Sequence, residues 1–346
     1  MYFASDNTAG IAAPILQAIG GANAGYALGY GNDDWTRRVE RRFAEIFERE
    51  VAVFLVPTGT VANALALAHL SPPWGAVLCH AESHIATDEC GAPEFFGAGI
   101  KLVGLEGDGA KVSAATLRDA LEQGQWGGPH HVTPSVLSLS QATECGTIYR
   151  VAEVRELADI AHARGVAVHM DGARIGNALA RMNVSPAEAT WKAGVDALSF
   201  GATKGGAMGA EAMIFFDRKR GAEMQSRRKR GGALASKHRF IAAQMEAYLE
   251  GDLWLTLARH ANAMADALSA GLAAAGCKPV WPVEANEVFA PISLEADERL
   301  KAAGAMYYPW PARPAIGPGK VLVRLVTSFQ TTQEDVDRFL AIVRAN

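Results

Sequence analysis

Lys204 is the residue of this sequence whose surroundings most favour covalent chemistry. It follows the short apolar run 197–200 and is flanked by glycine, alanine and threonine. Small residues of this kind let a flat ligand approach the backbone closely. A poorly hydrated lysine loses basicity and becomes an amine nucleophile that can form a Schiff base. Because a solvated loop lysine is the commoner case, the interpretation depends on the groups that the chain places around Lys204.

A second feature is a turn between an expected strand and an expected helix. Residues 51–56 form an apolar run, 57–60 read Pro-Thr-Gly-Thr, and 61–70 have the composition of a helix. The free N–H groups and the positive dipole end of such a helix attract anions, and the Thr58 and Thr60 hydroxyls add donors beside Gly59. No lysine follows at the spacing of a nucleoside-triphosphate loop. The sequence predicts an anion site here, the alternative being a plain helix cap by Thr58 or Thr60.

Polar side chains also follow two other expected strands. His84 lies in the loop after 76–79, and Asp171 and Arg174 come directly after 166–169. Further apolar runs predict strands at 100–105, 135–139, 197–200 and 212–216. Helical patterns separate several of these strands, which predicts an α/β fold with a mainly parallel sheet. Ligands bind beyond the carboxyl ends of the strands in such sheets, so the polar side chains should meet in one crevice.

An anion cradle, an imidazole, a carboxylate and an amine in one crevice are the groups needed to hold pyridoxal phosphate. The cradle would take the phosphate, and His84 would stack on the ring. Asp171 would keep the pyridine nitrogen protonated, so that the ring accepts electrons. Lys204 would hold the aldehyde as a Schiff base.

Composition limits the remaining classes of function. The chain has 346 residues, 49% of them hydrophobic, and a formal net charge of −4. We expect a protein with a sizeable core and no positive field to attract nucleic acid or an anionic membrane. No run of 18 apolar residues and no export signal are apparent, which predicts a cytoplasmic protein without a membrane span. The four cysteines have neither zinc-site nor disulfide-scaffold spacing, and no metal site is expected.

Composition changes towards the end of the chain. A basic stretch, 217–239, is interpreted as a solvated helix face, and a long helical stretch, 240–275, is broken near Gly251. Short strands follow at 280–283, 288–292 and 321–326, and Thr331 and Glu334 have capping-box spacing before a terminal helix. Residues 1–35 are expected to form an extended arm. We predict an arm and cofactor-binding large domain over 1–245, and a connector helix with a small α+β domain over 246–346.

The sequence as a whole resembles the L-threonine aldolase family, fold-type-I pyridoxal-phosphate enzymes of the threonine aldolase and β-eliminating lyase group. The resemblance covers nearly the whole chain. It depends on seven motifs in a fixed order: Ala4-Ser5-Asp6-Asn7, Tyr30-Gly31-Asn32-Asp33, Pro57-Thr58-Gly59-Thr60-Val61-Ala62-Asn63, Ser83-His84-Ile85, His169-Met170-Asp171-Gly172-Ala173-Arg174, Lys204-Gly205 and Val323-Arg324-Leu325-Val326-Thr327.

The family cleaves β-hydroxy-α-amino acids, such as threonine, allo-threonine and phenylserine, to glycine and an aldehyde. By this resemblance Lys204 is the Schiff-base lysine, Asp171 the partner of the pyridine nitrogen, and His84 the stacking group. Gly59 and Thr60 would hold the phosphate. His84, or a water that it orders, is the expected base for the β-hydroxyl proton, and Glu89 is a weaker candidate.

The resemblance also implies residues for the substrate and for a shared site. Ser5, Arg174 and Arg324 are expected to clamp the substrate carboxylate, and Arg174 also lies with the cofactor residues. Family members are typically homotetramers, dimers of dimers whose active sites share residues. Tyr30 is expected to line the substrate site near the subunit boundary, and Lys229 to reach the phosphate in a neighbouring subunit.

Two segments depart from the family pattern. Many members have a histidine within Glu-Asn-Thr-His-Asn after the fourth strand, whereas this chain reads Gln141-Ala142-Thr143-Glu144. The loop 205–209 lacks the proline common in the family. Alternatives to an aldolase are an amino acid racemase or β-eliminating lyase on the same scaffold, or a non-catalytic pyridoxal-phosphate fold that acts by binding.

Overall fold

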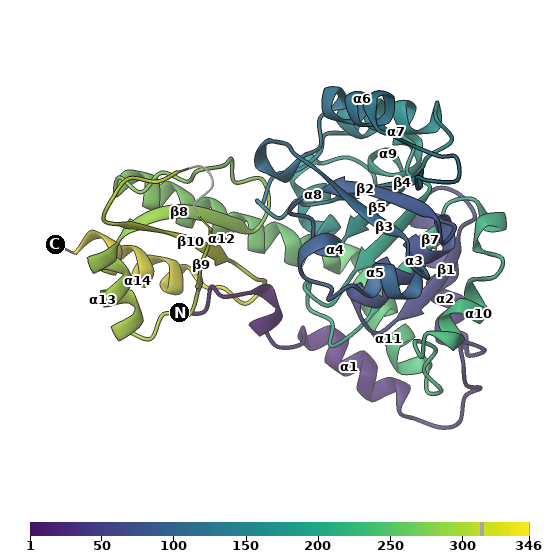
Figure 1. Ribbon diagram of the computed structural model, residues 1–346. Helices are drawn as coiled ribbons and strands as arrows, with labels where there is room; N and C mark the ends of the chain where they lie inside the picture. Colours follow the sequence, from purple (N-terminus) through teal and green to yellow (C-terminus); the bar gives the residue numbers. More distant parts are fainter. Residues whose placement is uncertain (312–314, 346) are drawn as a thin grey trace.

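A seven-stranded sheet forms the centre of the larger part of the molecule (Figure 1). The computed structural model describes residues 1–311 and 315–345. The strand order is β1-β7-β6-β5-β4-β2-β3. The strands are β1 (Ala52–Val56), β2 (Gly75–His80), β3 (Lys101–Leu105), β4 (Thr133–Ser140), β5 (Ala167–Gly172), β6 (Ala197–Gly201) and β7 (Glu211–Phe215).

The sheet is mainly parallel, as predicted. Strands β6, β5, β4, β2 and β3 pair in parallel, whereas β7 runs antiparallel to both of its neighbours, β1 and β6. The central strands β2, β5 and β6 are buried along their whole length, which is why they appear in the sequence as short, continuous apolar runs.

Helices flank this sheet, with α6, α7 and α9 above it and α1 and α11 below it in the view of Figure 1. The helices of this part are α1 (Ala13–Ala22), α2 (Asp34–Ile46), α3 (Gly59–Leu70), α4 (His84–Thr87), α5 (Ala92–Phe96), α6 (Ala114–Gln123), α7 (Val151–His162), α8 (Ile175–Met182), α9 (Pro186–Ala189), α10 (Met224–Arg230) and α11 (Arg239–Leu249). Short 3₁₀ turns lie at Asp6–Thr8, Asp108–Ala110, Trp191–Ala193, Arg218–Gly221 and Glu250–Asp252.

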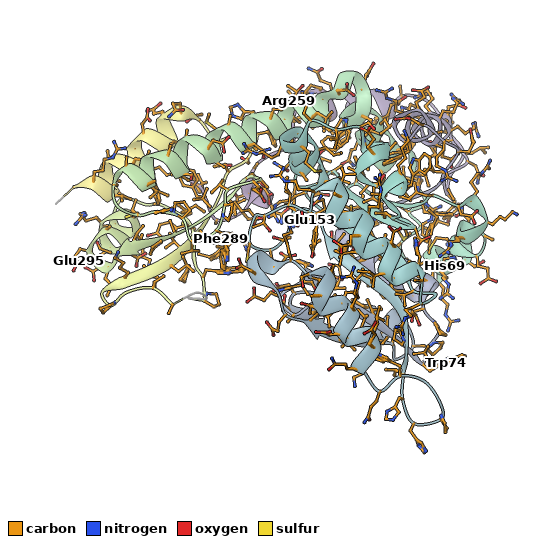
Figure 2. The ribbon with its side chains drawn as sticks, turned by 90° about the horizontal axis from the view of Figure 1, so that it is seen from above. His69, Trp74, Glu153, Arg259, Phe289 and Glu295 are labelled. Carbon is orange, nitrogen blue, oxygen red and sulfur yellow. The ribbon has the colours of Figure 1, made fainter. Side chains whose placement is uncertain are left out.

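A smaller α+β part holds the C-terminus. Helix α12 (Leu253–Ala274) runs from the large part into it, and Figure 2 shows Arg259 on this helix with Phe289 and Glu295 beyond. The small part has an antiparallel sheet in the order β8-β10-β9. Its elements are β8 (Glu287–Ser293), α13 (Leu294–Ala302), β9 (Tyr308–Pro309), β10 (Lys320–Val326) and α14 (Gln333–Arg344).

The first residues of the chain pack against this small part. The Phe3 amide donates to the Met306 carbonyl at 2.7 Å, and the Phe3 carbonyl accepts from the Val326 amide at 2.8 Å. The Phe3 ring lies in the small core, 5.2 Å from the ring of Phe339. The chain therefore begins in the small part and passes from there to α1 in the large part, so that its first residues tie the two parts together (Figure 1).

Three local predictions were wrong. Residues 13–22, expected in an extended arm, form α1, because Ile15 and Ala22 bury one face of a helix that starts at Ala13 and has Pro14 in its first turn. Residues 280–283 form no strand. The terminal helix is capped by Thr332 and Asp335 rather than by Thr331 and Glu334, a shift of one residue. Among the described helices, none is both long and apolar enough to cross a membrane.

Candidate active site

The ends of four strands meet at one edge of the large sheet. Gly201 at the end of β6 and Val56 at the end of β1 both pair with Glu211, the first residue of the antiparallel strand β7. Asp171 lies near the end of β5 and pairs with Ser199. The segments that follow these strands therefore surround the same space, where we expected the crevice.

An inner cavity of about 320 Å³ lies at this edge. It brings together seven of the residues predicted for cofactor and catalysis. They are Thr58, Gly59, Thr60, His84, Asp171, Arg174 and Lys204. The remaining lining includes Asn7, Asn63, Glu89, Glu144, Ser199, Thr203, Met208 and Glu211.

An outer cavity of about 660 Å³ adjoins the inner one. It adds Ser5 and Arg324 from the predicted set, together with Trp310. Three carboxylates that follow β2 and β3 also line it: Glu82, Asp88 and Glu106. Asn7, His84, Glu144, Arg174 and Lys204 line both cavities. These five side chains form the junction between the two spaces, and we call them the junction residues.

The predicted anion cradle has the geometry of a helix N-terminus. Thr58 is the N-cap of α3, and its hydroxyl accepts from the Val61 amide at 3.3 Å. The first amides of a helix have no partner within the helix, so those of Gly59 and Thr60 are available to an anion. A Cβ built on Gly59 meets no atom within 4 Å, so space remains beside the backbone for a phosphate.

Asp171 is part of a chain of polar contacts that ends at His84. Its Oδ1 accepts from the Ala173 amide at 3.0 Å, and its Oδ2 accepts from Asn63 Nδ2 at 2.8 Å. Asn63 Nδ2 also donates to Glu89 Oε1 at 2.9 Å, and the same oxygen lies 2.8 Å from His84 Nδ1. The hydrogen bond to Glu89 raises the pKa of His84. Glu89 therefore orients the imidazole that we expect above the cofactor ring.

Arg174 is held by acidic groups of this chain. Its Nε and Nη2 donate to the two carboxylate oxygens of Asp6 at 2.7 and 3.1 Å, and Nη1 lies 3.4 Å from Glu287 Oε2. Burial favours the neutral form of Asp6, but the charges of Arg174 and Lys204 and the hydrogen bonds from Arg174 and Asn286 together outweigh it, and the pKa of Asp6 is lowered. The Arg174 guanidinium is thus held in one position by Asp6 and Glu287. A substrate carboxylate that binds Arg174 would have to share its N–H donors with Asp6.

Arg324 has fewer protein partners than Arg174, the other arginine predicted to bind the substrate carboxylate. It lies on β10 between Val323 and Leu325, which point into the small core, so the alternation of a strand turns its side chain towards the outer cavity. Its guanidinium lies 5.1 Å from the Trp310 ring centroid, and Nε is 3.9 Å from Glu287 Oε1. Its Nε is buried without a hydrogen-bond partner, which suits the capture of a carboxylate.

Glu211 is a buried carboxyl in the inner cavity that sequence analysis missed. Its Oε2 accepts from the Ala202 amide at 3.2 Å. Burial raises the pKa of Glu211 to about 7, although the Thr203 side chain and the Lys204 charge oppose the shift. The group thus titrates in the neutral range beside the lysine.

Because the folded protein holds the Glu211 proton more tightly than the unfolded chain does, this group loses its stabilising contribution as pH rises. The loss runs from the ordinary carboxyl pKa near 4.5 to about 7 and amounts to about 3 kcal/mol. We expect Glu211→Gln to remove this pH dependence. The free energy of unfolding of the variant minus that of wild type should therefore be larger at pH 8 than at pH 5. Urea unfolding of the cofactor-free protein at both pH values, at one protein concentration, measures it. Equal pH dependence in the two proteins would contradict the assignment.

Tyr30 and Lys229 line neither cavity within the described chain. Lys229 Nζ lies 4.7 Å from the centroid of the Tyr30 ring, and Tyr30 is about half exposed. The two residues form a surface pair on the large part, so any role at an active site requires a second subunit.

Asn7, Asn63, Glu144 and Glu211 line the cavities but had not been chosen from the sequence. Asn63 had a usable signal, because it follows the Thr58 cap by five residues and projects from the start of the same helix. Glu211 was visible as one acid before an otherwise apolar strand. Neither signal was specific enough without knowledge of the neighbouring strands.

Known proteins resemble this chain over nearly its whole length. The β-eliminating lyase family model matches residues 2–295. A low-specificity L-threonine aldolase from Pseudomonas sp. (strain NCIMB 10558) is 40% identical over 99% of this chain and 97% of its own. The low-specificity L-threonine aldolase of Pseudomonas aeruginosa is 41% identical over 99% of this chain and 96% of its own. The solved threonine aldolase of Leishmania major, 28% identical, superposes with a TM-score of 0.93 over 99% and 98% of the two chains.

The fold and the site define a fold-type-I pyridoxal-phosphate enzyme, which confirms the predicted fold class. Its lyase class follows from the family match. The chain belongs to the β-eliminating lyase family and, within it, to the L-threonine aldolase family, as the sequence motifs predicted.

Proposed function

We propose that this protein cleaves L-threonine, L-allo-threonine and related β-hydroxy-α-amino acids to glycine and an aldehyde, with pyridoxal phosphate as cofactor. The observation that supports this most is that Lys204 and Asp171 line one cavity with a helix N-terminus. The chain also has relatives at about 40% identity that are named low-specificity L-threonine aldolases.

The inner cavity fits the cofactor in three respects. The amides of Gly59 and Thr60 and the Thr58 cap would hold its phosphate, Asp171 its ring nitrogen, and Lys204 its aldehyde carbon. Bound there, pyridoxal phosphate supplies an electron sink for the pair left on the substrate Cα when a bond to that carbon breaks. The Asp171 carboxylate accepts hydrogen bonds from Asn63 and from the Ala173 amide, which fix it in place.

The substrate would occupy the junction and the outer cavity. Arg324 binds its carboxylate there, with Arg174 and Ser5 at the same wall. A carboxylate held by a guanidinium fixes the rotation about Cα and therefore which bond is aligned for cleavage. The outer cavity of about 660 Å³ is large for a threonine side chain, which favours a broad range that includes phenylserine.

Product analysis tests the proposal and separates it from its alternatives. Purified protein loaded with pyridoxal phosphate should release acetaldehyde and glycine in equal amounts from L-threonine. A β-eliminating lyase would instead produce a 2-oxo acid and ammonia, and a racemase would invert Cα alone and produce D-allo-threonine. A binding protein without activity would yield no product. Any of these three results would overturn the proposal.

Arg324→Ala should raise KM for L-threonine more than it lowers kcat. Loss of a charge-assisted hydrogen bond costs about 1.5–3 kcal/mol, which corresponds to a rise in KM of about 10- to 150-fold. Arg324→Lys should recover little, because an ammonium lacks the planar fork that a carboxylate fits. Steady-state kinetics of the three proteins measures the effect. An unchanged KM in Arg324→Ala would show that another group binds the carboxylate.

We further propose that the protein is a cytoplasmic homotetramer, a dimer of dimers with shared active sites. The exposed pair of Tyr30 and Lys229 supports a shared site, since a cation outside the cavities of its own chain is available to the phosphate of a neighbour.

A further inference from the structure

Glu144 is a junction residue for which the proposed cofactor binding supplies no role. It lies in the loop after β4, where its neighbours Gln141, Thr143 and Cys145 are each 1% exposed. Glu144 itself is only partly buried and lines both cavities. The loop thus buries the residues on either side of Glu144 and presents this carboxyl to the ligand space.

The loop is held rigidly. The Gln141 side chain exchanges two hydrogen bonds with the Tyr149 backbone, at 2.8 and 2.9 Å. The Thr143 hydroxyl contacts the Gly109 carbonyl and the Thr147 hydroxyl, each at 2.9 Å. A carboxyl on such a support is positioned in advance, which catalytic groups require.

Among the five junction residues, Glu144 is the one carboxyl. Its Oε1 accepts from the His84 amide at 3.2 Å. Within the described residues no hydrogen bond occupies Oε2, so that oxygen is available to a ligand. Within that part of the chain Glu89 also has an oxygen without a hydrogen-bond partner, Oε2. Its side chain, however, is fully buried and lines the inner cavity alone, and its Oε1 is committed to His84 and Asn63.

The charges around Glu144 favour proton exchange. Burial raises the pKa of this carboxyl, and the carboxylates of Glu287 on β8 and Asp171 on β5 add to the rise. The cations Lys204 and Arg174 oppose it. A pKa moved towards the working pH is what a general base needs. His84 is less suited, because its raised pKa increases the protonated form, which cannot accept a proton.

We infer that Glu144 is the base that removes the β-hydroxyl proton of the substrate, an inference that rests on the proposed aldolase function. The hydroxyl proton passes to Glu144, the O–H bonding pair forms the carbonyl of the leaving aldehyde, and the Cα–Cβ bond breaks with its pair remaining on Cα. Lys204, freed from the cofactor when the substrate amine takes its place and protonated in that exchange, then gives a proton to Cα, which completes glycine. Glu144 afterwards returns its proton to Lys204, both being at the junction, and Lys204 regains its bond to the cofactor when glycine leaves.

Glu144→Gln tests the inference, with Glu144→Asp as the variant that keeps a carboxyl. Loss of a general base should lower kcat for L-threonine cleavage by about 10²- to 10⁴-fold in the glutamine variant, and by less in the aspartate variant. Exchange of the glycine α-proton in D₂O involves no β-hydroxyl, so it should stay within about threefold of wild type. Pyridoxal-phosphate affinity, measured by absorbance titration, should also stay unchanged. The part of the low-pH fall in kcat/KM that comes from Glu144 should be missing from the glutamine variant, so its profile should differ from wild type and keep only the titration of other site groups such as Glu211.

The outcomes separate the two proposals. If wild type releases no aldehyde, the aldolase function itself fails. If wild type cleaves threonine and Glu144→Gln cleaves it within about threefold, Glu144 is not the base. If Glu144→Gln loses cleavage, α-proton exchange and cofactor affinity together, the residue maintains the structure of the site and the inference is also overturned.

Discussion

Replacing Lys204 by alanine should abolish both turnover and the visible absorbance of the bound cofactor. The amine is the one group at the junction that can bond to the cofactor aldehyde, and loss of a covalent catalytic group costs on the order of 10⁴- to 10⁶-fold in kcat. Absorbance spectra and single-turnover assays with L-threonine measure the two effects.

Lys204→Arg and Lys101→Ala are the matched controls. The arginine keeps the positive charge but forms no Schiff base, so it should be as inactive as alanine. Lys101 is exposed on the edge strand β3, and its loss should leave spectrum and rate unchanged. A Lys204→Ala protein that retains a tenth of the wild-type rate would exclude the covalent role.

Asp171→Asn should have the second-largest effect. The amide keeps the shape of the carboxylate and can still contact Asn63, but it cannot balance a charge on the pyridine nitrogen. Removing one such electrostatic group from a preorganised site costs on the order of 10²- to 10³-fold in kcat. Steady-state rates with L-threonine measure it.

Asp171→Glu separates charge from fit. It restores the charge at a shifted position, so we expect it to be more active than Asp171→Asn, with cofactor still bound in both by absorbance. If Asp171→Asn keeps half of the wild-type kcat, the carboxylate faces something other than the cofactor nitrogen.

The strands and the grouping of chemistry-bearing residues were predictable because both depend on local sequence. Buried parallel strands appear as short apolar runs, and the residues that follow them meet at one edge by the geometry of the sheet. Asp171 and Lys204 were found in this way. Helix α1 was missed because its glycines and alanines resemble a loop when the partner helix α11 is unknown.

The long-range pairings were not predictable. Asp6 and Arg174 are 168 residues apart, and nothing local indicates that the expected substrate arginine is already held by an N-terminal carboxylate. Glu144 belonged to a segment noted only for departing from the family pattern. Its importance came from its place between two cavities, of which the outer one includes Trp310 and Arg324 of the small part and so depends on how the two parts pack.

The most direct test of the central claim is to reduce the cofactor-loaded protein with borohydride and map the pyridoxyl group by peptide mass spectrometry. The site described here predicts the label on Lys204, and its loss when Lys204 is replaced by arginine. A label on another lysine, or no label on a protein that still cleaves L-threonine, would contradict it.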